Sequence, residues 1–301
     1  MKIDFLGDMK LMANKSNQKV IFLDIDGTLC DYNGTIPDSA KQAIWLARSN
    51  NHLVFLNTGR SKGEMDADLL NIGFDGMICG NGNFVEVNQK VILHQPLPET
   101  VEVEIVNWLK EHHSEFFLES NNGLFASEHF REKGLPVVRA YVQGKGQTDV
   151  SHMTVDTAFP AMQYGESIFR DDVNKISFIL TDEVQPEIVK KQFPHLEFGT
   201  WGGRDEQPLF GDLRPKGITK SNAIKYLLQY LNLSLRDTIA FGDAQVDIPM
   251  FELCGIGVCM ENGGPNAKKN ADLVTDAVMD NGLYHAFEKL SLLQTFRSII
   301  T

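Results

Sequence analysis

Short, unbroken apolar runs alternate with helical segments along the first part of this chain, and this alternation constrains the fold more than any other feature. The runs Val20–Leu23, Leu53–Leu56 and Gly76–Cys79 are strand-sized, and their continuous apolar character is typical of strands buried on both faces of a parallel sheet. Between them, apolar residues at helical spacing predict one helix that begins near Pro37 and another that ends at Gly73. This order predicts right-handed crossovers and therefore an α/β protein with a Rossmann-like, doubly wound parallel sheet core.

The alternation stops at about residue 95 and resumes at Gly217. Two prolines mark the change, and the helices and strands that follow have the mixed order of an α+β unit. We therefore expect an α+β domain inserted into the core. The expected boundaries are residues 18–95 and 213–301 for the core and residues 96–212 for the inserted domain.

Charge and cysteine usage limit the partners and the compartment. The 301 residues include 40 acidic and 28 basic side chains, a formal net charge of −12, which disfavours general binding to nucleic acid or to an anionic membrane. Four scattered cysteines without a metal-type spacing indicate a reducing compartment, and we expect a cytoplasmic protein, either monomer or homodimer. Residues 1–17 lack the apolar stretch of a secretory signal and are expected to be a disordered leader or a start-site artefact.

The strongest local signal is a pair of carboxylates, Asp24 and Asp26, directly after the first buried strand. Open α/β folds build their sites at the carboxyl ends of the strands. Two acids one residue apart point to different sides of an extended chain and can therefore take different roles. The alternative is a solvated acidic turn, but the wholly buried strand before it favours a functional site.

Four stretches of the sequence, in order, resemble the four motifs of the haloacid dehalogenase (HAD) superfamily of phosphotransferases. They are Asp24–Leu29 (DIDGTL), Thr58-Gly59-Arg60, Lys220 within Pro215–Lys220, and Gly242–Met250 (GDAQVDIPM). Gly80-Asn81-Gly82 and the insertion between the second and third motifs resemble the Cof-like branch, whose inserted domain is a type IIB cap. The resemblance covers residues 19–290.

The resemblance implies a Mg²⁺-dependent phosphomonoester hydrolase that acts on a small phosphorylated metabolite, a sugar phosphate being one candidate, through an aspartyl-phosphate. Asp24 is the expected nucleophile, and Asp26 is expected to protonate the leaving oxygen and later to deprotonate water. The implied Mg²⁺ ligands are Asp24, the backbone carbonyl of Asp26, and Asp243. Asp247 is the expected outer-shell or water-mediated partner of the metal.

The phosphoryl group is expected to bind Thr58, through its hydroxyl, and Lys220, which would also pair with Asp24. The positions of Ile25, Gly59 and Arg60 are expected to supply further phosphate contacts. Each residue also has a more ordinary interpretation. Thr58 would cap a helix over residues 60–70, and the acids after Gly242 would stabilise a helix N-terminus.

Two departures from the family pattern affect substrate and rate more than mechanism. Val246 stands where the family usually has asparagine, and Glu261 where it tends to have glycine. Two alternatives stay open: a phosphomutase resembling phosphomannomutases, which needs cap arginines for a second phosphate, and a catalytically weak metabolite-binding protein on the same scaffold. The cap residues considered as substrate contacts are Asn121, Asn122, Arg131, Arg139, Trp201 and Arg204.

Overall fold

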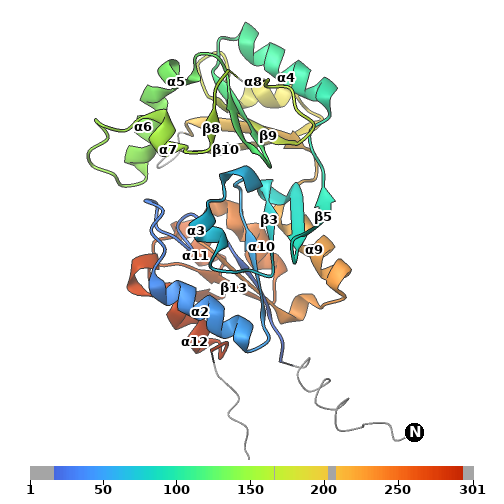
Figure 1. The fold of residues 1–301 in the computed structure, drawn as a ribbon, viewed down its shortest axis with the longest axis vertical. Helices are drawn as coiled ribbons and strands as arrows, with labels where there is room; N and C mark the ends of the chain where they lie inside the picture. Colours follow the sequence, from blue (N-terminus) through green and yellow to red (C-terminus); the bar gives the residue numbers. More distant parts are fainter. Residues whose placement is uncertain (1–16, 166, 203–207, 294–301) are drawn as a thin grey trace, which may run out of the picture.

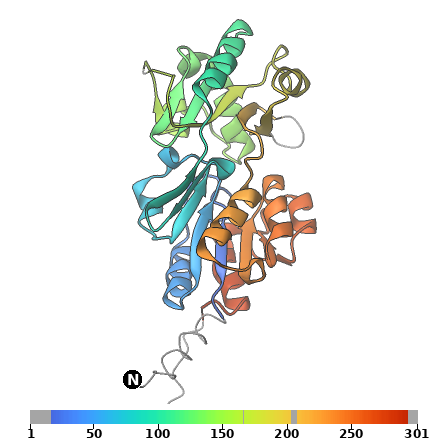
Figure 2. The same ribbon diagram turned by 90° about the vertical axis from the view of Figure 1, so that its right-hand side faces the viewer.

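The computed structural model describes residues 17–165, 167–202 and 208–293. The predicted leader, apart from residue 17, and Arg204 lie outside the described residues. The helices and strands form two parts, each built on its own sheet and stacked one above the other (Figure 1). Figure 2 shows from the side that two chain segments connect these parts.

The larger part contains an eight-stranded sheet in the order β14-β13-β12-β1-β2-β3-β4-β5. Its strands are β1 (Val20–Leu23), β2 (Leu53–Asn57), β3 (Gly76–Cys79), β4 (Phe84–Val87), β5 (Lys90–His94), β12 (Thr238–Gly242), β13 (Ile256–Cys259) and β14 (Leu273–Val274). The strands from β14 to β3 pair in parallel, and β4 and β5 add an antiparallel edge. The chain leaves β1 first towards β2 and returns on its other side as β12, so a topological switch point lies at β1.

Helices cover both faces of this sheet, as a doubly wound fold requires. They are α2 (Asp38–Ser49), α3 (Ala67–Leu70), α9 (Lys220–Leu231), α10 (Ile248–Leu253), α11 (Pro265–Lys269) and α12 (Gly282–Lys289). Alternate residues of each strand serve opposite faces. Ile21 and Leu23 of β1 pack in the cluster that contains α2 and α12, whereas Val20 and Phe22 pack in the cluster that contains α9 and α10.

The helix predicted over residues 60–70 is not continuous. The chain instead forms a short 3-10 helix, η1 (Lys62–Glu64), and then the separate α3. Glu64 accepts a hydrogen bond from the backbone N–H of Ser61 at 2.7 Å, and Asp66 accepts one from that of Leu69 at 2.7 Å. Two local caps therefore divide the segment, although its apolar residues have helical spacing.

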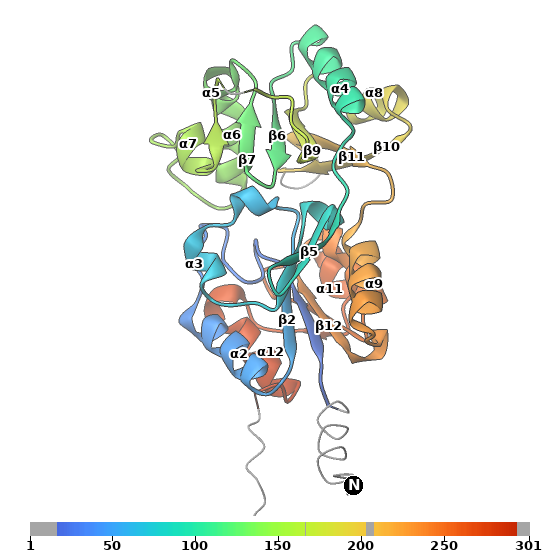
Figure 3. The same ribbon diagram turned by 45° about the vertical axis from the view of Figure 1, so that its right-hand side comes forward.

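The smaller part is the cap, with a six-stranded sheet in the order β10-β11-β9-β6-β7-β8. Its strands are β6 (Phe116–Ser120), β7 (Gly123–Ala126), β8 (Met162–Gln163), β9 (Val173–Ile179), β10 (Leu196–Trp201) and β11 (Phe210–Pro215). Its helices are α4 (Glu99–Glu111), α5 (Phe130–Lys133), α6 (Leu135–Gly144), α7 (Val155–Ala158) and α8 (Pro186–Gln192). Figure 3 shows α4 and α8 together in one region of the cap and α5, α6 and α7 in another.

This arrangement confirms the expected fold class, an α/β core with an inserted α+β cap. Strand β11 runs to Pro215, beyond the expected end of the cap, and the exact division of the chain into domains stays a prediction. The remaining 3-10 helices are η2 (Gly80–Gly82), η3 (Leu235–Asp237), η4 (Gln245–Asp247) and η5 (Val278–Asp280). Within the described ranges, no helix is both long and apolar enough to cross a membrane.

Candidate active site

Three buried carboxylates meet at the carboxyl ends of the neighbouring strands β1 and β12. The pairing of Leu23 with Phe241 fixes the register, so Asp24 and Asp243 leave adjacent strands side by side. The 3-10 helix η4 brings Asp247 to the same place, and one oxygen from each acid lies within 4.8 Å of the others. Carboxylate oxygens suit a hard divalent cation such as Mg²⁺, so this donor set fits the implied metal.

Lys220 provides the positive charge of this cluster. Its Nζ donates to Asp24 Oδ1 at 2.6 Å and to Asp247 Oδ1 at 2.7 Å. Burial works against the charged lysine, but the two carboxylates outweigh that effect and raise the pKa of Lys220. Burial raises the pKa of Asp24; Lys220 opposes the rise, and the Asp247 and Asp243 carboxylates add to it. Three acids facing one lysine leave an excess of negative charge that a divalent cation would neutralise.

The two oxygens of Asp247 are engaged by the protein itself. Oδ1 accepts from Lys220, and Oδ2 accepts from the backbone N–H groups of Asp243 and Ala244 at 3.1 and 3.0 Å. Asp247 therefore fixes the loop that carries Asp243. This arrangement favours contact with a metal through water over direct ligation.

Asp243 is held by two hydroxyl groups from the loop after β1. Thr28 Oγ1 donates to Oδ1 at 3.2 Å, and the Tyr32 hydroxyl donates to Oδ2. Burial raises the pKa of Asp243 to about 6, and the neighbouring Asp247 carboxylate adds to the shift. Gly27 is required beside these groups because its φ is +84° and an added Cβ would lie 2.3 Å from Asp243 Oδ2. The sequence analysis missed Tyr32, which belongs to none of the motifs.

Asp26 lies beside the cluster with both oxygens bound by Arg60. Arg60 Nε donates to Oδ2 at 2.8 Å and its Nη2 to Oδ1 at 2.7 Å. Burial opposes ionisation of Asp26, but the hydrogen bonds and charge of Arg60 outweigh it and hold the pKa of this carboxyl below its usual range. Arg60, expected at the phosphate, therefore pairs with the expected acid in this structure. Lys145, which the sequence analysis also missed, lies 3.7 Å from Asp26 Oδ1.

The other expected phosphate contacts flank this pair. Thr58 is buried at the end of β2, and its hydroxyl accepts from the Arg60 backbone N–H at 3.1 Å instead of capping a helix. Gly59 faces Asn81, since an added Cβ would lie 3.2 Å from Asn81 Oδ1. Ile25 is buried in the core. Only the backbone of Ile25 is therefore available to a phosphoryl group.

Most of the candidate cap residues have partners within the cap. Arg131 pairs with Asp156 at 2.9 Å, and Arg139 donates to the carbonyl oxygens of Ser151 and Met153. Trp201 stacks on Phe210. The two asparagines make side-chain hydrogen bonds, Asn121 to His94 and Asn174, and Asn122 to Asp172.

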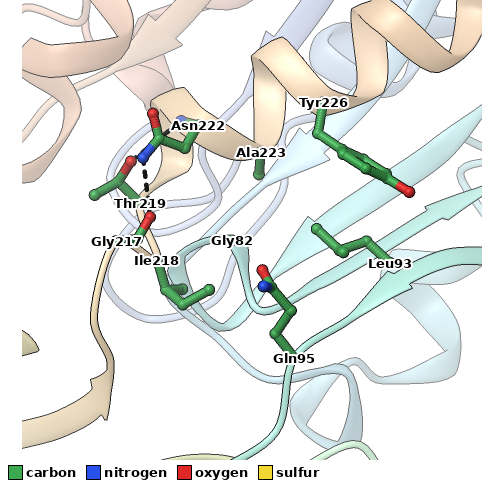
Figure 4. A pocket seen from close by; sticks show the side chains of 9 residues that line it. All are labelled: Gly82, Leu93, Gln95, Gly217, Ile218, Thr219, Asn222, Ala223 and Tyr226. Carbon is green, nitrogen blue, oxygen red and sulfur yellow. Dashed lines mark hydrogen bonds between the residues drawn. The ribbon is translucent and has the colours of Figure 1, made fainter. Parts of the chain in front are cut away.

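The two departures from the family pattern lie outside this network of contacts. Val246 is 52% exposed, and Glu261 is exposed and pairs with Lys268 at 2.9 Å. A pocket of about 230 Å³ also lies apart from the acids, between β5 and the start of α9 (Figure 4). Its lining includes Leu93, Gln95 and Tyr226 and none of the site residues above.

The comparison with known proteins agrees with the four motifs. Residues 21–287 match the haloacid dehalogenase-like hydrolases. The chain belongs to this family, as the sequence predicts. A protein of Bacillus subtilis (strain 168) named "Putative phosphatase YkrA" is 30% identical over 280 residues, which cover 92% of this chain and 100% of that protein.

Solved structures show the same fold. A hypothetical protein of Geobacillus kaustophilus HTA426 superposes with a TM-score of 0.75 at 23% identity, covering 91% of this chain and 99% of that one. The HAD subclass IIB sugar phosphatase BT4131 gives a TM-score of 0.71 at 24% identity, covering 91% and 100%. These likenesses confirm the fold, including the cap type that the sequence predicts.

Proposed function

We propose that the chain is a Mg²⁺-dependent phosphatase that removes the phosphoryl group of a small phosphorylated metabolite through an intermediate on Asp24. That it is a phosphatase of the haloacid dehalogenase-like hydrolases follows from its family and its named relatives. The observation that carries the mechanism is the contact of Lys220 with Asp24 beside Asp243, next to a second acid, Asp26. This set provides a nucleophile, a counter-charge and a proton donor within one small region.

The proposed reaction has two steps on the same carboxylate. An oxygen of Asp24 attacks phosphorus, the ester bond to the leaving oxygen breaks, and Asp26 gives its proton to that oxygen. Water then attacks the phosphorus, Asp26 takes the proton of that water, and the bond to Asp24 breaks to release inorganic phosphate. Lys220 reduces the repulsion between the Asp24 carboxylate and the phosphoryl oxygens.

The metal would be held by the carboxylates of Asp24 and Asp243 and by the backbone carbonyl of Asp26, with Asp247 in contact through water. When bound, Mg²⁺ would withdraw negative charge from the phosphoryl oxygens. Tyr32 and Thr28 orient Asp243 for this task through their hydroxyl groups.

The proton transfer requires Arg60 to leave Asp26 when substrate binds. A guanidinium donates well to phosphoryl oxygens, so the substrate offers it a replacement partner. Departure of Arg60 also lets Asp26 carry a proton, because Arg60 is what holds its pKa low. Arg60 would therefore both bind the phosphoryl group and determine when Asp26 carries a proton.

The leaving group is proposed to meet the cap sheet at its polar end. The residues on one face of that sheet are apolar at one end (Phe117, Ile179, Phe210) and polar at the other (Glu119, Lys175, Ser177, Asp212, Arg214). At this end of the cap sheet, η1 of the core lies close to the start of β7, since a Cβ on Gly63 would lie 2.1 Å from the Gly123 backbone nitrogen. Polar side chains at this place suit a hydroxyl-rich leaving group such as a sugar, and a structural relative is a sugar phosphatase by name.

The two alternative functions have weaker support. A phosphomutase needs cap arginines for its second phosphate, yet Arg131, Arg170 and Arg214 each pair with an aspartate of the cap. A binding protein without catalysis has no need for a nucleophile, a lysine and two further acids in contact. Buried, free cysteines fit a reducing compartment, and we propose the cytoplasm as the location.

The proposal is tested by phosphate release from p-nitrophenyl phosphate and from a panel of sugar phosphates, with Mg²⁺ and with a chelator. We expect release that depends on Mg²⁺ and is lost in the Asp24→Asn variant. The Asp31→Asn variant is a matched control, because Asp31 follows the same motif but lies outside the carboxylate cluster. Release that survives in Asp24→Asn would contradict the nucleophile, and wild-type protein inactive on every substrate would contradict the proposed substrate class.

A further inference from the structure

Lys145 brings a cation of the cap to the reacting region of the core. It directly follows α6, and its Nζ lies 3.7 Å from Asp26 Oδ1. The Lys145 side chain is only 23% exposed. No family motif contains this residue, and the function proposed above assigns it no role.

Two tyrosine rings, one from each part of the molecule, flank the Lys145 ammonium. Its Nζ lies 4.6 Å from the ring centre of Tyr141 in the cap and 5.5 Å from that of Tyr32 in the core. Aromatic faces attract cations, so both rings stabilise the charge. Tyr141 packs edge-on against Trp201 of the cap sheet, at 5.3 Å between ring centres. Lys145 is therefore anchored to the cap, although it faces the core.

A second contact joins the same two loops. Gln147, two residues after Lys145, donates from Nε2 to the Oδ1 of Asn33 at 3.0 Å. Asn33 is the residue after Tyr32. The loop after α6 therefore touches the loop after β1, which also carries the tyrosine bound to Asp243. The position of Lys145 beside Asp26 consequently depends on contact between the cap and the core.

The Lys145 ammonium remains able to donate to a ligand. Its distance of 3.7 Å from Asp26 exceeds hydrogen-bond length, and both Asp26 oxygens already accept from Arg60. A lysine has three N–H donors; the Tyr141 side chain accepts from one of them, so donors remain for a ligand. An anionic oxygen that enters this region would meet a cation already held in place by two rings.

We propose that Lys145 is a substrate-binding residue that donates to an anionic oxygen of the substrate, so that the closed cap binds negatively charged ligands more tightly. This inference rests on the proposed function, because it takes the carboxylate cluster as the place of reaction. The oxygen belongs either to the phosphoryl group or to an acidic substituent of the leaving group. A chain with a net charge of −12 needs such local cations to hold an anion.

Direct binding tests the proposal without requiring turnover. Calorimetric dissociation constants in Mg²⁺ are measured for inorganic phosphate, glucose 6-phosphate and 6-phosphogluconate. All proteins carry Asp24→Asn so that the esters are not hydrolysed, and Lys145 is intact or replaced as Lys145→Met or Lys145→Arg. Lys110→Met is the matched control, because it removes the same charge from an exposed position of the cap. Thermal unfolding of each variant checks that the fold is intact.

Loss of one charged hydrogen bond predicts binding weaker by about tenfold to a hundredfold in Lys145→Met, with most of the affinity retained in Lys145→Arg. Weaker binding of all three ligands would assign Lys145 to the phosphoryl group. Weaker binding of 6-phosphogluconate alone would assign it to an acidic leaving group. Unchanged affinity for every ligand, or an equal loss in Lys110→Met, would overturn the proposal. Because no turnover is needed, this result is independent of the phosphate-release assay.

Discussion

Lys220 donates a 2.6 Å hydrogen bond to Asp24, a residue 196 positions earlier in the chain. Lys220 is the first residue of α9, where the helix dipole disfavours a cation. Its placement therefore depends on the two carboxylates it contacts, Asp24 and Asp247. One ammonium thus links the end of β1, the start of α9 and the loop after β12.

Replacement of Lys220 should lower kcat by more than a loss of folded protein would explain. In Lys220→Met, Asp24 and the phosphoryl group would repel each other without a counter-charge. We expect kcat to fall by about a hundredfold to a thousandfold, the usual cost of losing one such donor. Steady-state kinetics with p-nitrophenyl phosphate measures the effect. The control is Lys225→Met, an exposed lysine of the same helix, which should leave kcat unchanged. Similar kcat values in the two variants would contradict the role of Lys220.

Alanine variants of two glycines distinguish the cost of backbone strain from the effect of displacing Asp243, a proposed metal ligand. Gly27 and Gly34 both have positive φ, +84° and +83°, but only an added Cβ at Gly27 would collide with Asp243. Each alanine variant should lose about 1–2 kcal/mol of unfolding free energy from the backbone. Gly27→Ala should in addition require more Mg²⁺ for half-maximal activity, because Asp243 is displaced. Denaturant unfolding and Mg²⁺ titration measure the two effects, and an equal Mg²⁺ requirement in both variants would contradict the prediction.

Asp26→Asn should slow the reaction in a manner that depends on the leaving group. A poor leaving group needs the proton of Asp26, so kcat for an alkyl phosphate should fall by about 10²–10⁴-fold. The fall should be smaller for p-nitrophenyl phosphate, whose leaving group departs without a proton. The comparison of kcat for the two substrates is the measurement. A loss of the same size for both would argue against Asp26 as the acid.

Glu102 gives a prediction about stability and pH in the cap. This residue of α4 is fully buried, and burial raises its pKa to about 7. In the unfolded chain the carboxyl has its ordinary, lower pKa, so the folded protein binds the proton more tightly and loses stability as pH rises from about 4.5 towards 7. Glu102→Gln should therefore raise the melting temperature at pH 8 and change it little at pH 5. Thermal unfolding at both pH values measures this.

The matched control for that experiment lies on the same helix. Glu104 is exposed, and Glu104→Gln should leave the melting temperature unchanged at both pH values. A gain in Glu102→Gln that is equal at pH 5 and pH 8 would show that charge burial is not its cause.

The buried strands and the acids that follow them were enough to predict the core and the pair of carboxylates at the centre of the candidate site. Buried strands that end in acids predict a sheet edge where Asp24 and Asp243 meet, and the structure brings them within a few ångströms. The physical reason is that parallel strands share one direction, so their carboxyl ends gather at one edge. The prediction of one continuous helix over residues 60–70 failed because the caps at Ser61 and Asp66 each begin a separate short helix. Apolar spacing does not reveal such caps.

The sequence by itself therefore determined the α/β core and the inserted cap, which follow from the order of elements along the chain. It also predicted the family and the acids around Lys220, which follow from the resemblance of its four motifs to those of the haloacid dehalogenase superfamily. Only the tertiary structure decided that Arg60 binds Asp26, that Tyr32 binds Asp243 and that Lys145 reaches the site from the cap. Each of these contacts joins two segments that lie apart in the sequence, and the sequence pattern of one segment does not identify its partner. Arg60 and Tyr32 meet their partners through packing within the core, and Lys145 meets Asp26 where the cap packs against the core. In each case the partner is selected by distance in space.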